Sequence, residues 1–287
     1  MIGDFDGRVA VVTGAAHGIG RALAIGLAAE GMRVVAVDID GSGALATAQQ
    51  AGAGAVATAR QAGAAAVARQ VDVADAAAVD ALADYCFAEF GQVDLLVNNA
   101  GVFQGGLCWE RSVEDWQWAL GVNVFGIIHG QRSFLPRMIA QGTEGHVINT
   151  ASVAAFVSAP LSGPYVVSKC AAFSLTECLA HDLALVGSKI GASVLVPSAF
   201  DTAIARSSTV RPARFGVDST EDGQGTAAAL AQIISQGMSP DEAVGPVLDG
   251  IRSGTFLIPT RPSYAEQLRH RYEALRDREL PALTEVD

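Results

Sequence analysis

A glycine-rich turn joins a buried strand to a helix near the start of the chain. Gly14, Gly18 and Gly20 follow an apolar run at residues 8–12, and apolar side chains then recur at helical spacing over residues 19–27. Glycine lets the backbone turn tightly, and the first turn of a helix offers unpaired N–H groups and a positive dipole end. The pattern predicts an α/β fold that holds a phosphate group at this turn. The residues expected to contact it are Gly14, His17, Gly18, Ile19 and Gly20.

Short apolar runs alternate with helical patterns through the rest of the chain. Runs typical of buried strands occupy residues 8–12, 33–38, 66–71, 94–97, 146–149, 192–196 and 255–259. Helical patterns lie between them. One covers residues 44–61, and another opens with a capping box of Ser112 and Asp115 and extends to about Met138. Such alternation implies a parallel sheet covered on both faces. No linker divides the chain, so we expect a single domain over residues 1–287.

Composition narrows the classes of partner and compartment. Of the 287 residues 50% are hydrophobic and 17% charged, so the chain can bury a large core. Its net charge of −11 argues against a nucleic-acid partner. Four cysteines without a Cys-x-x-Cys pair predict neither a disulfide framework nor a metal site, and the start lacks a signal-peptide pattern. We therefore expect a cytoplasmic protein.

The uncharged stretch at residues 147–168 is long enough to span a bilayer. It contains proline and glycine, however, so we do not expect it to cross a membrane.

An acidic residue ends the second predicted strand. Asp38 lies eighteen residues beyond Gly20, where a carboxylate can accept hydrogen bonds from the hydroxyls of an adenosine ribose. The same carboxylate would repel a 2′-phosphate, and Ile39 and Asp40 follow it rather than an arginine or lysine. NAD is therefore the predicted cofactor, and NADP is the alternative that the partial positive charge of His17 leaves open. A solvated residue at a strand end is the other interpretation of Asp38.

A serine, a tyrosine and a lysine form the second informative pattern. Tyr165 and Lys169 lie four residues apart in a predicted helix, so their side chains share one face, and Ser152 follows the fifth strand. A phenol has an ordinary pKa of about 10, and a nearby ammonium lowers that pKa, which suits proton transfer near neutral pH. Ser152 can bind a substrate oxygen. Each residue alone is more often structural, but together with the glycine turn they predict hydride transfer.

These motifs, together with Asp72-Val73 and Asn98-Asn99-Ala100-Gly101, resemble those of the short-chain dehydrogenase/reductase family over nearly the whole chain. The resemblance implies a Rossmann-like, doubly wound sheet of seven parallel strands in three α/β/α layers. It implies an NAD(P)-dependent alcohol dehydrogenase or ketone reductase in which Tyr165 is the general acid/base and no metal takes part. The implied catalytic residues are Asn123, which holds a water beside the lysine, Ser152, Tyr165 and Lys169. The implied cofactor contacts beyond the glycine turn and Asp38 are Asp72, Val73, Asn99, Ala100, Gly101, Tyr165, Lys169, Pro197 and Thr202.

The sequence leaves the substrate and the exact reaction open. Ser198 follows Pro197 where the family usually has glycine, so a side chain there narrows the pocket or moves the neighbouring loop. The residues expected to form the pocket walls are mostly apolar: Phe103, Val153, Phe156, Leu161 and Phe200. Such walls predict a small, largely apolar alcohol or ketone as the substrate. An epimerase, dehydratase or dehalogenase, or a non-catalytic cofactor-sensing protein, are the rival interpretations. The family resemblance also implies a homotetramer or a homodimer.

Two further segments stand outside the regular pattern. Residues from about 199 to 237 follow the sixth strand, and a connection this long is often a lid over an active site. We expect it to order over cofactor and substrate, and a permanently folded pair of short helices is the alternative. Its arginines, which either face solvent or bind an acidic group, are Arg206, Arg211 and Arg214. A helical segment at about 262–279 carries an apolar stripe that packs on its own subunit or on a second copy.

Overall fold

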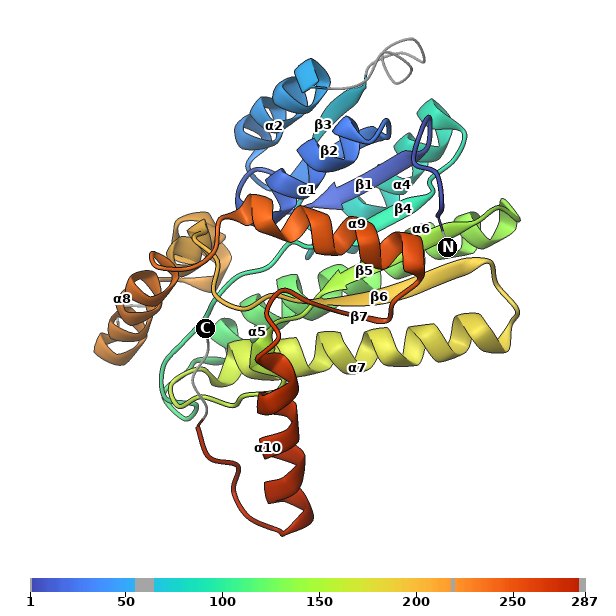
Figure 1. The fold of residues 1–287 in the computed structure, drawn as a ribbon. Coiled ribbons are helices and arrows are strands. Elements are labelled where there is room, and N and C mark those ends of the chain that lie inside the picture. The colour runs from blue at the N-terminus through green and yellow to red at the C-terminus, as the bar shows by residue number, and fades with distance from the viewer. Residues whose placement is uncertain (1, 55–64, 218–219, 284–287) are drawn as a thin grey trace.

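The computed structural model describes residues 2–54, 65–217 and 220–283. Its sheet has seven strands in the order β3-β2-β1-β4-β5-β6-β7, and each neighbouring pair is parallel. Helices cover both faces of this sheet, giving three layers (Figure 1). The predicted Rossmann-like fold is therefore confirmed. The strand order reverses between β1 and β4, which is where open α/β sheets bind ligands at the carboxyl ends of their strands.

The strands are short and rich in β-branched residues, which suit a pleated, buried surface. They are β1 (Val9–Thr13), β2 (Arg33–Asp38), β3 (Ala66–Gln70), β4 (Leu95–Asn98), β5 (Gly145–Thr150), β6 (Ile190–Val196) and β7 (Leu257–Pro259). Alternate residues of β1 face opposite sides. Ala10 and Val12 belong to one core cluster, and Val9 and Val11 to another. Both faces of β1 are therefore packed, as expected for a central parallel strand.

One face of the sheet is covered by α1 (Gly18–Ala29), α2 (Gly41–Gly54) and α9 (Val244–Ser253), whose apolar residues join the first cluster. The other face is covered by α4 (Ala76–Phe90), α6 (Gly126–Ala140) and α7 (Gly163–Leu185). Asp75 caps α4 by accepting from two backbone N–H groups, and Gly91 ends it in a left-handed conformation, as the sequence predicts. Of the helix expected over residues 44–61, positions 55–61 lie outside the described residues.

The helix expected from Ser112 to about Met138 is interrupted. The capping box of Ser112 and Asp115 is present and opens α5 (Val113–Leu120). A π-helical turn, η1 (Gly121–Phe125), then precedes α6. A π-turn inserts one residue into the helical repeat and often marks a functional position. Here it carries the buried Asn123, so the interruption coincides with a predicted site residue.

Residues 199–237 contain several helical segments. They hold two 3₁₀ helices, η3 (Ala203–Val210) and η4 (Ala213–Phe215), followed by α8 (Glu221–Ile234). The polar stretch beginning near Gly216 leads into α8, which Thr220 caps and whose first turn holds the acidic residues Glu221 and Asp222. Of that stretch, positions 218–219 lie outside the described residues. A 3₁₀ turn, η5 (Pro240–Ala243), leads from this segment into α9.

The chain closes with α10 (Tyr264–Arg276), which projects away from the sheet (Figure 1). Tyr264 and Leu268 pack against the cluster around Phe156, whereas Tyr272 and Leu275 remain largely exposed. Within the described ranges, no helix has both the length and the apolar character that crossing a bilayer requires.

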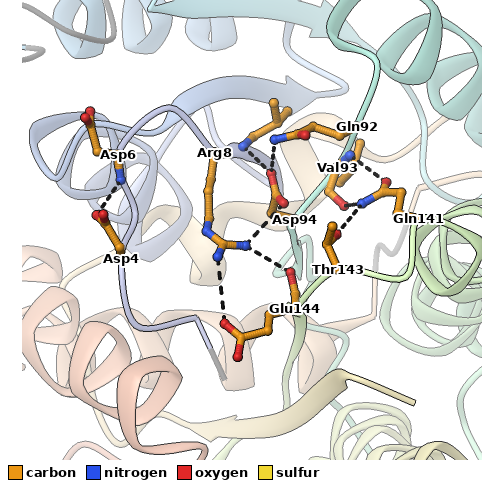
Figure 2. A network of polar contacts seen from close by, with 10 residues as sticks. Asp4, Asp6, Arg8, Gln92, Val93, Asp94, Gln141, Thr143 and Glu144 are labelled. Carbon is orange, nitrogen blue, oxygen red and sulfur yellow. Dashed lines mark hydrogen bonds and ion pairs between the residues drawn. The ribbon is translucent and has the colours of Figure 1, made fainter.

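A polar network ties strands β1, β4 and β5 together at their amino ends, opposite the ligand-binding edge (Figure 2). The buried Asp94 carboxylate accepts from the Val9 backbone N–H at 2.8 Å and from Gln92 Nε2 at 2.9 Å. Arg8 lies 3.4 Å from the same carboxylate and donates to the Glu144 carbonyl at 3.0 Å. A buried carboxylate needs such partners, so this network stabilises the sheet at the amino ends of these strands.

Candidate active site

The glycine turn between β1 and α1 is closed so tightly that side chains do not fit. Gly14 and Gly18 have φ of +67° and +54°, a region that favours glycine. A Cβ at Gly18 would lie 2.9 Å from Thr202 Cγ2, and one at Gly20 only 2.1 Å from the Gly14 carbonyl oxygen. His17 caps α1 without a side-chain hydrogen bond, and its ring faces Asp40 at 3.5 Å. The turn therefore leaves backbone N–H groups at the helix start for an anion.

The motif around Asn99 braces this turn. Asn99 Nδ2 donates to the Thr13 carbonyl at 3.0 Å, and the backbone N–H groups of Asn99 and Ala100 donate to Thr13 Oγ1 at 3.0 and 3.1 Å. A Cβ at Gly14 would lie 2.8 Å from Ala100 Cα, so the two loops touch along their backbones. Thr13 opens the glycine-rich motif of the sequence but was not among the residues predicted to form the site.

Ser152, Tyr165 and Lys169 converge at the carboxyl ends of β5 and β6. Lys169 is buried and donates from Nζ to the Thr150 carbonyl at 3.0 Å, and Nζ lies 5.7 Å from the centre of the Tyr165 ring. Ser152 Oγ accepts from the Ala154 N–H at 3.1 Å and lies 3.5 Å from the Pro197 carbonyl. The structure thus brings together the three side chains that the sequence paired with the glycine turn.

The ionisation of this group is set mainly by burial. Burial raises the pKa of the Tyr165 phenol above its ordinary value, and a hydrogen bond with Ser152 opposes that shift. This direction differs from the lowering expected from a nearby ammonium, because desolvation is the larger effect. Burial lowers the pKa of Lys169 to about 8, so its ammonium form still predominates at neutral pH. The arrangement therefore holds a protonated phenol beside a cation.

Asn123 connects the π-turn to the tyrosine helix. Its amide Nδ2 donates to the Val102 carbonyl at 2.9 Å and to Ser168 Oγ at 2.8 Å, and its Oδ1 accepts from the Val102 N–H at 2.8 Å. Ser168 in turn donates to the Tyr165 carbonyl at 2.7 Å. A Cβ at Gly101 would approach both Lys169 Nζ, at 3.4 Å, and Asn123 Oδ1, at 3.5 Å. Asn123 is thus next to the lysine, and Ser168 is a linking residue that the sequence did not reveal.

A cavity of about 790 Å³ extends from the glycine turn past Tyr165 to residues 199–237. Its cofactor-side wall includes Gly14, Asp38, Lys169, Pro197 and Thr202. Four of the five predicted apolar wall residues line it: Phe103, Val153, Leu161 and Phe200. Phe156 instead packs in a core cluster with Phe173. One face of α8, including Ala229, Leu230 and Ile233, also lines the cavity, and the sequence did not predict that contribution.

A second cavity, of about 100 Å³, adjoins the glycine turn at Gly14. It is lined by Asp38, Asp72 and Val73, as well as by Ala100 and Gly101. Asp38 Oδ2 accepts from the Ala16 N–H at 2.9 Å, which fixes the carboxylate at the end of β2. Asp38 lines both cavities.

Residues 199–237 are tied to the segment after β4 by two ion pairs. Arg211 lies 2.7 Å from Asp115, and both side chains are less than a tenth exposed. Arg111, whose side chain is fully buried, lies 2.8 Å from Asp222 at the start of α8. Arg214 pairs with Asp72 at 3.4 Å, and Arg206 lies at the exposed rim of the larger cavity. Of the three arginines in residues 199–237, Arg211 and Arg214 thus pair with acidic side chains of the chain itself.

These features fit a dinucleotide. The glycines let the turn pack closely against Ala100 and Thr202, and Gly14 and Gly18, the latter at the start of α1, line the larger cavity. Helix N–H groups there could hold a pyrophosphate, Asp38 could accept from a ribose, and Lys169 lines the same cavity farther along. Among the described residues, no group of three or more histidine, cysteine or acidic side chains is placed to hold a metal ion.

Known proteins share this arrangement of elements. Residues 8–212 match the family model described as short chain dehydrogenase. The chain belongs to the short-chain dehydrogenase family. It is 39% identical to a short-chain dehydrogenase/reductase from Burkholderia phymatum, solved in complex with NAD. The two share a TM-score of 0.91, over 98% of this chain and 99% of that one.

Two curated members of the short-chain dehydrogenase family extend the likeness to almost the full length. One is the C alpha-dehydrogenase of Sphingobium sp., 32% identical over 97% of this chain and 88% of that protein. The other is the CLA biosynthesis dehydrogenase/reductase of Lactiplantibacillus plantarum, 30% identical over 95% of this chain and 94% of that protein. The family membership makes the chain an oxidoreductase.

Proposed function

We propose that this chain is an NAD-dependent oxidoreductase that interconverts a secondary alcohol and a ketone, with Tyr165 as general acid/base. The observation that carries the proposal is the convergence of Ser152, Tyr165 and Lys169 on the cavity that begins at the glycine turn. Proton transfer and hydride transfer act on the same carbinol carbon and oxygen, so both functions must meet in one cavity. No observation on the site favours an epimerase, a dehydratase or a cofactor sensor over this reaction.

Each residue of the site has a separate role in the proposed reaction. A bound nicotinamide dinucleotide supplies or accepts the hydride. The Tyr165 hydroxyl gives its proton to the carbonyl oxygen during reduction and takes it back during oxidation. The Ser152 hydroxyl donates a hydrogen bond to the same oxygen, and the ammonium of Lys169 offsets the charge left on the phenolate. Asn123 holds the helix of Tyr165 in register through Ser168.

We assign NAD rather than NADP on the basis of Asp38. The carboxylate lines both cavities and is followed by Ile39 and Asp40, so a 2′-phosphate would meet negative charge. The relative from Burkholderia phymatum, whose structure contains NAD, supports the same choice. Arg214, the arginine of residues 199–237 that lines the smaller cavity, pairs with Asp72 and so has a carboxylate partner within the chain.

The substrate is a small molecule that is largely apolar. The walls beyond Tyr165 are formed by aromatic and aliphatic side chains of three separate segments, including Phe103, Leu161 and Leu230. Phe103 also packs against the Tyr165 ring, with centres 5.2 Å apart. A panel of aliphatic and aromatic secondary alcohols, incubated with NAD and followed at the NADH absorbance band, tests the proposal. The expected result is NADH formation, and no signal from any alcohol, nor from the matching ketones with NADH, would contradict it.

The assembly and the compartment follow from weaker signals. Exposed apolar side chains on η1 and α7, among them Phe125 and Val167, support a homodimer or homotetramer. Light scattering at micromolar concentration should therefore give a mass above that of one chain. The four cysteines are free thiols, which supports a reducing compartment such as the cytoplasm.

A further inference from the structure

The two cavities adjoin at the glycine turn, because they share the lining residues Gly14, Asp38, Gly101, Val102 and Val210. Among the described residues, Tyr165 and Lys169 line the larger cavity, and neither lines the smaller one. A dinucleotide that crosses the turn with its reacting end at Tyr165 therefore has its adenosine half in the smaller cavity. This step rests on the function proposed above.

The outer wall of the smaller cavity comes from residues 199–237, far from it in sequence. Pro212, Arg214 and Phe215, in and beside η4, line it together with Asp72 and Val73. The Arg214 guanidinium carbon lies 4.7 Å from the centre of the Phe215 ring. An aromatic ring and a planar guanidinium group are the two protein surfaces on which a purine stacks well.

A buried ion pair ties this wall to α5. Arg211 donates to the Phe215 carbonyl at 2.6 Å and pairs with Asp115 at 2.7 Å. Its guanidinium carbon also lies 4.9 Å from the Trp118 ring. The second carboxylate oxygen of Asp115 accepts from the Ser112 N–H in the capping box of α5. The position of η4 is thus set by a contact with α5, which lies outside residues 199–237.

We propose that Phe215 and Arg214 form a clamp that holds the adenine ring of the cofactor, with Arg211 as the positioning residue that aims it. The segment then serves both ends of the ligand, because α8 covers the reacting end and η4 covers the adenine end. The contrasting interpretation is that Phe215 only packs the segment onto the sheet. In that case its removal would change stability and leave the affinity for adenosine ligands unaltered.

The test is calorimetric binding of AMP, which carries the adenosine half alone, and of ADP-ribose. Phe215→Ala should weaken the binding of both about tenfold or more, and Phe215→Tyr should stay within about threefold of the parent because it keeps the ring. Arg214→Ala should weaken both severalfold, and its side chain is exposed enough to leave folding intact. Tyr272→Ala, which removes an exposed aromatic ring of α10 outside both cavities, is the matched control.

The outcomes separate the clamp from the function. If the parent binds NADH and AMP while Phe215→Ala and Arg214→Ala bind AMP within twofold of it, the clamp is wrong and the proposed function stands. If the parent binds neither NADH nor AMP, the proposed function fails and the clamp with it. A melting temperature for each variant identifies loss of fold, and Arg214→Ala then decides the question if Phe215→Ala does not fold.

Discussion

The buried His146 should make the protein lose stability in mild acid. Its ring is fully buried in β5, and Nε2 lies 2.7 Å from Ser193 Oγ, which itself donates to the Thr255 carbonyl. Ser193 therefore accepts from Nε2–H, and a Cβ on Gly191 would come within 2.6 Å of Nδ1, so that edge of the ring is closely packed. Burial lowers the pKa of His146 from 6.5 to about 4. The folded state thus keeps the imidazole neutral where the unfolded chain would already bind a proton.

The sign and size follow from linkage. At pH values well above 6.5 the imidazole is neutral in both states and contributes nothing. As the pH falls, the unfolded state gains a proton first, so the free energy of unfolding drops by about 2 kcal/mol at pH 5 and about 3 kcal/mol below pH 4. The assay is urea unfolding of the parent and of His146→Gln, which keeps an N–H donor for Ser193 but does not titrate.

The difference in unfolding free energy between parent and variant cancels the other titrating groups. Between pH 7.5 and pH 5, the free energy of unfolding of the parent should fall by about 2 kcal/mol relative to that of the variant. His270→Gln, on the exposed surface of α10, is the control for the loss of an imidazole from the chain. A parent-minus-variant difference that is flat from pH 7.5 to pH 4.5 would refute the reasoning.

Three further predictions concern the site. Asp38→Ala combined with Ile39→Arg removes the like charge and adds a phosphate partner, so the ratio of kcat/KM for NADP to that for NAD should rise at least about tenfold. An unchanged ratio would place Asp38 away from the ribose. Because burial lowers the pKa of Lys169 to about 8, kcat/KM for NADH in ketone reduction should fall above that pH as the ammonium is lost, and a profile flat to pH 9.5 would contradict this. Residues 203–217 and 221–234 should gain protection from amide hydrogen exchange when NAD and substrate bind, since they cover both cavities. Equal, strong protection with and without ligand would instead support a permanently folded segment.

Most of the fold could be predicted because its signals are local. The seven apolar runs coincide with β1 to β7, within two residues at their ends, and Asp75 and Gly91 mark the limits of α4. What failed depended on distant contacts. The π-turn at η1 packs Asn123 against Val102 of another loop, and α8 is held by Arg111, more than a hundred residues away in sequence. Neither contact leaves a periodic pattern in the segment it shapes.

The candidate site divides in the same way. Tyr165 and Lys169 are one helical turn apart, so their shared face was readable from spacing, and the glycines of the turn were readable from residue type. The pairing of Arg211 with Asp115 was not, because the capping box already accounted for Asp115 and an arginine in a polar loop is usually solvated. The net direction of the Tyr165 pKa also depends on burial, which the sequence alone does not give.

The central claim is that Tyr165 carries the proton of the reaction, and Tyr165→Phe tests it most directly. The phenylalanine keeps the ring that packs against Phe103 and removes only the hydroxyl. Turnover of the best secondary alcohol should fall by a factor of about 10² to 10⁴, while the dissociation constant for NADH, measured by fluorescence, stays within about threefold of the parent. Turnover within threefold of the parent enzyme would remove Tyr165 from its role and with it the mechanism proposed for this site.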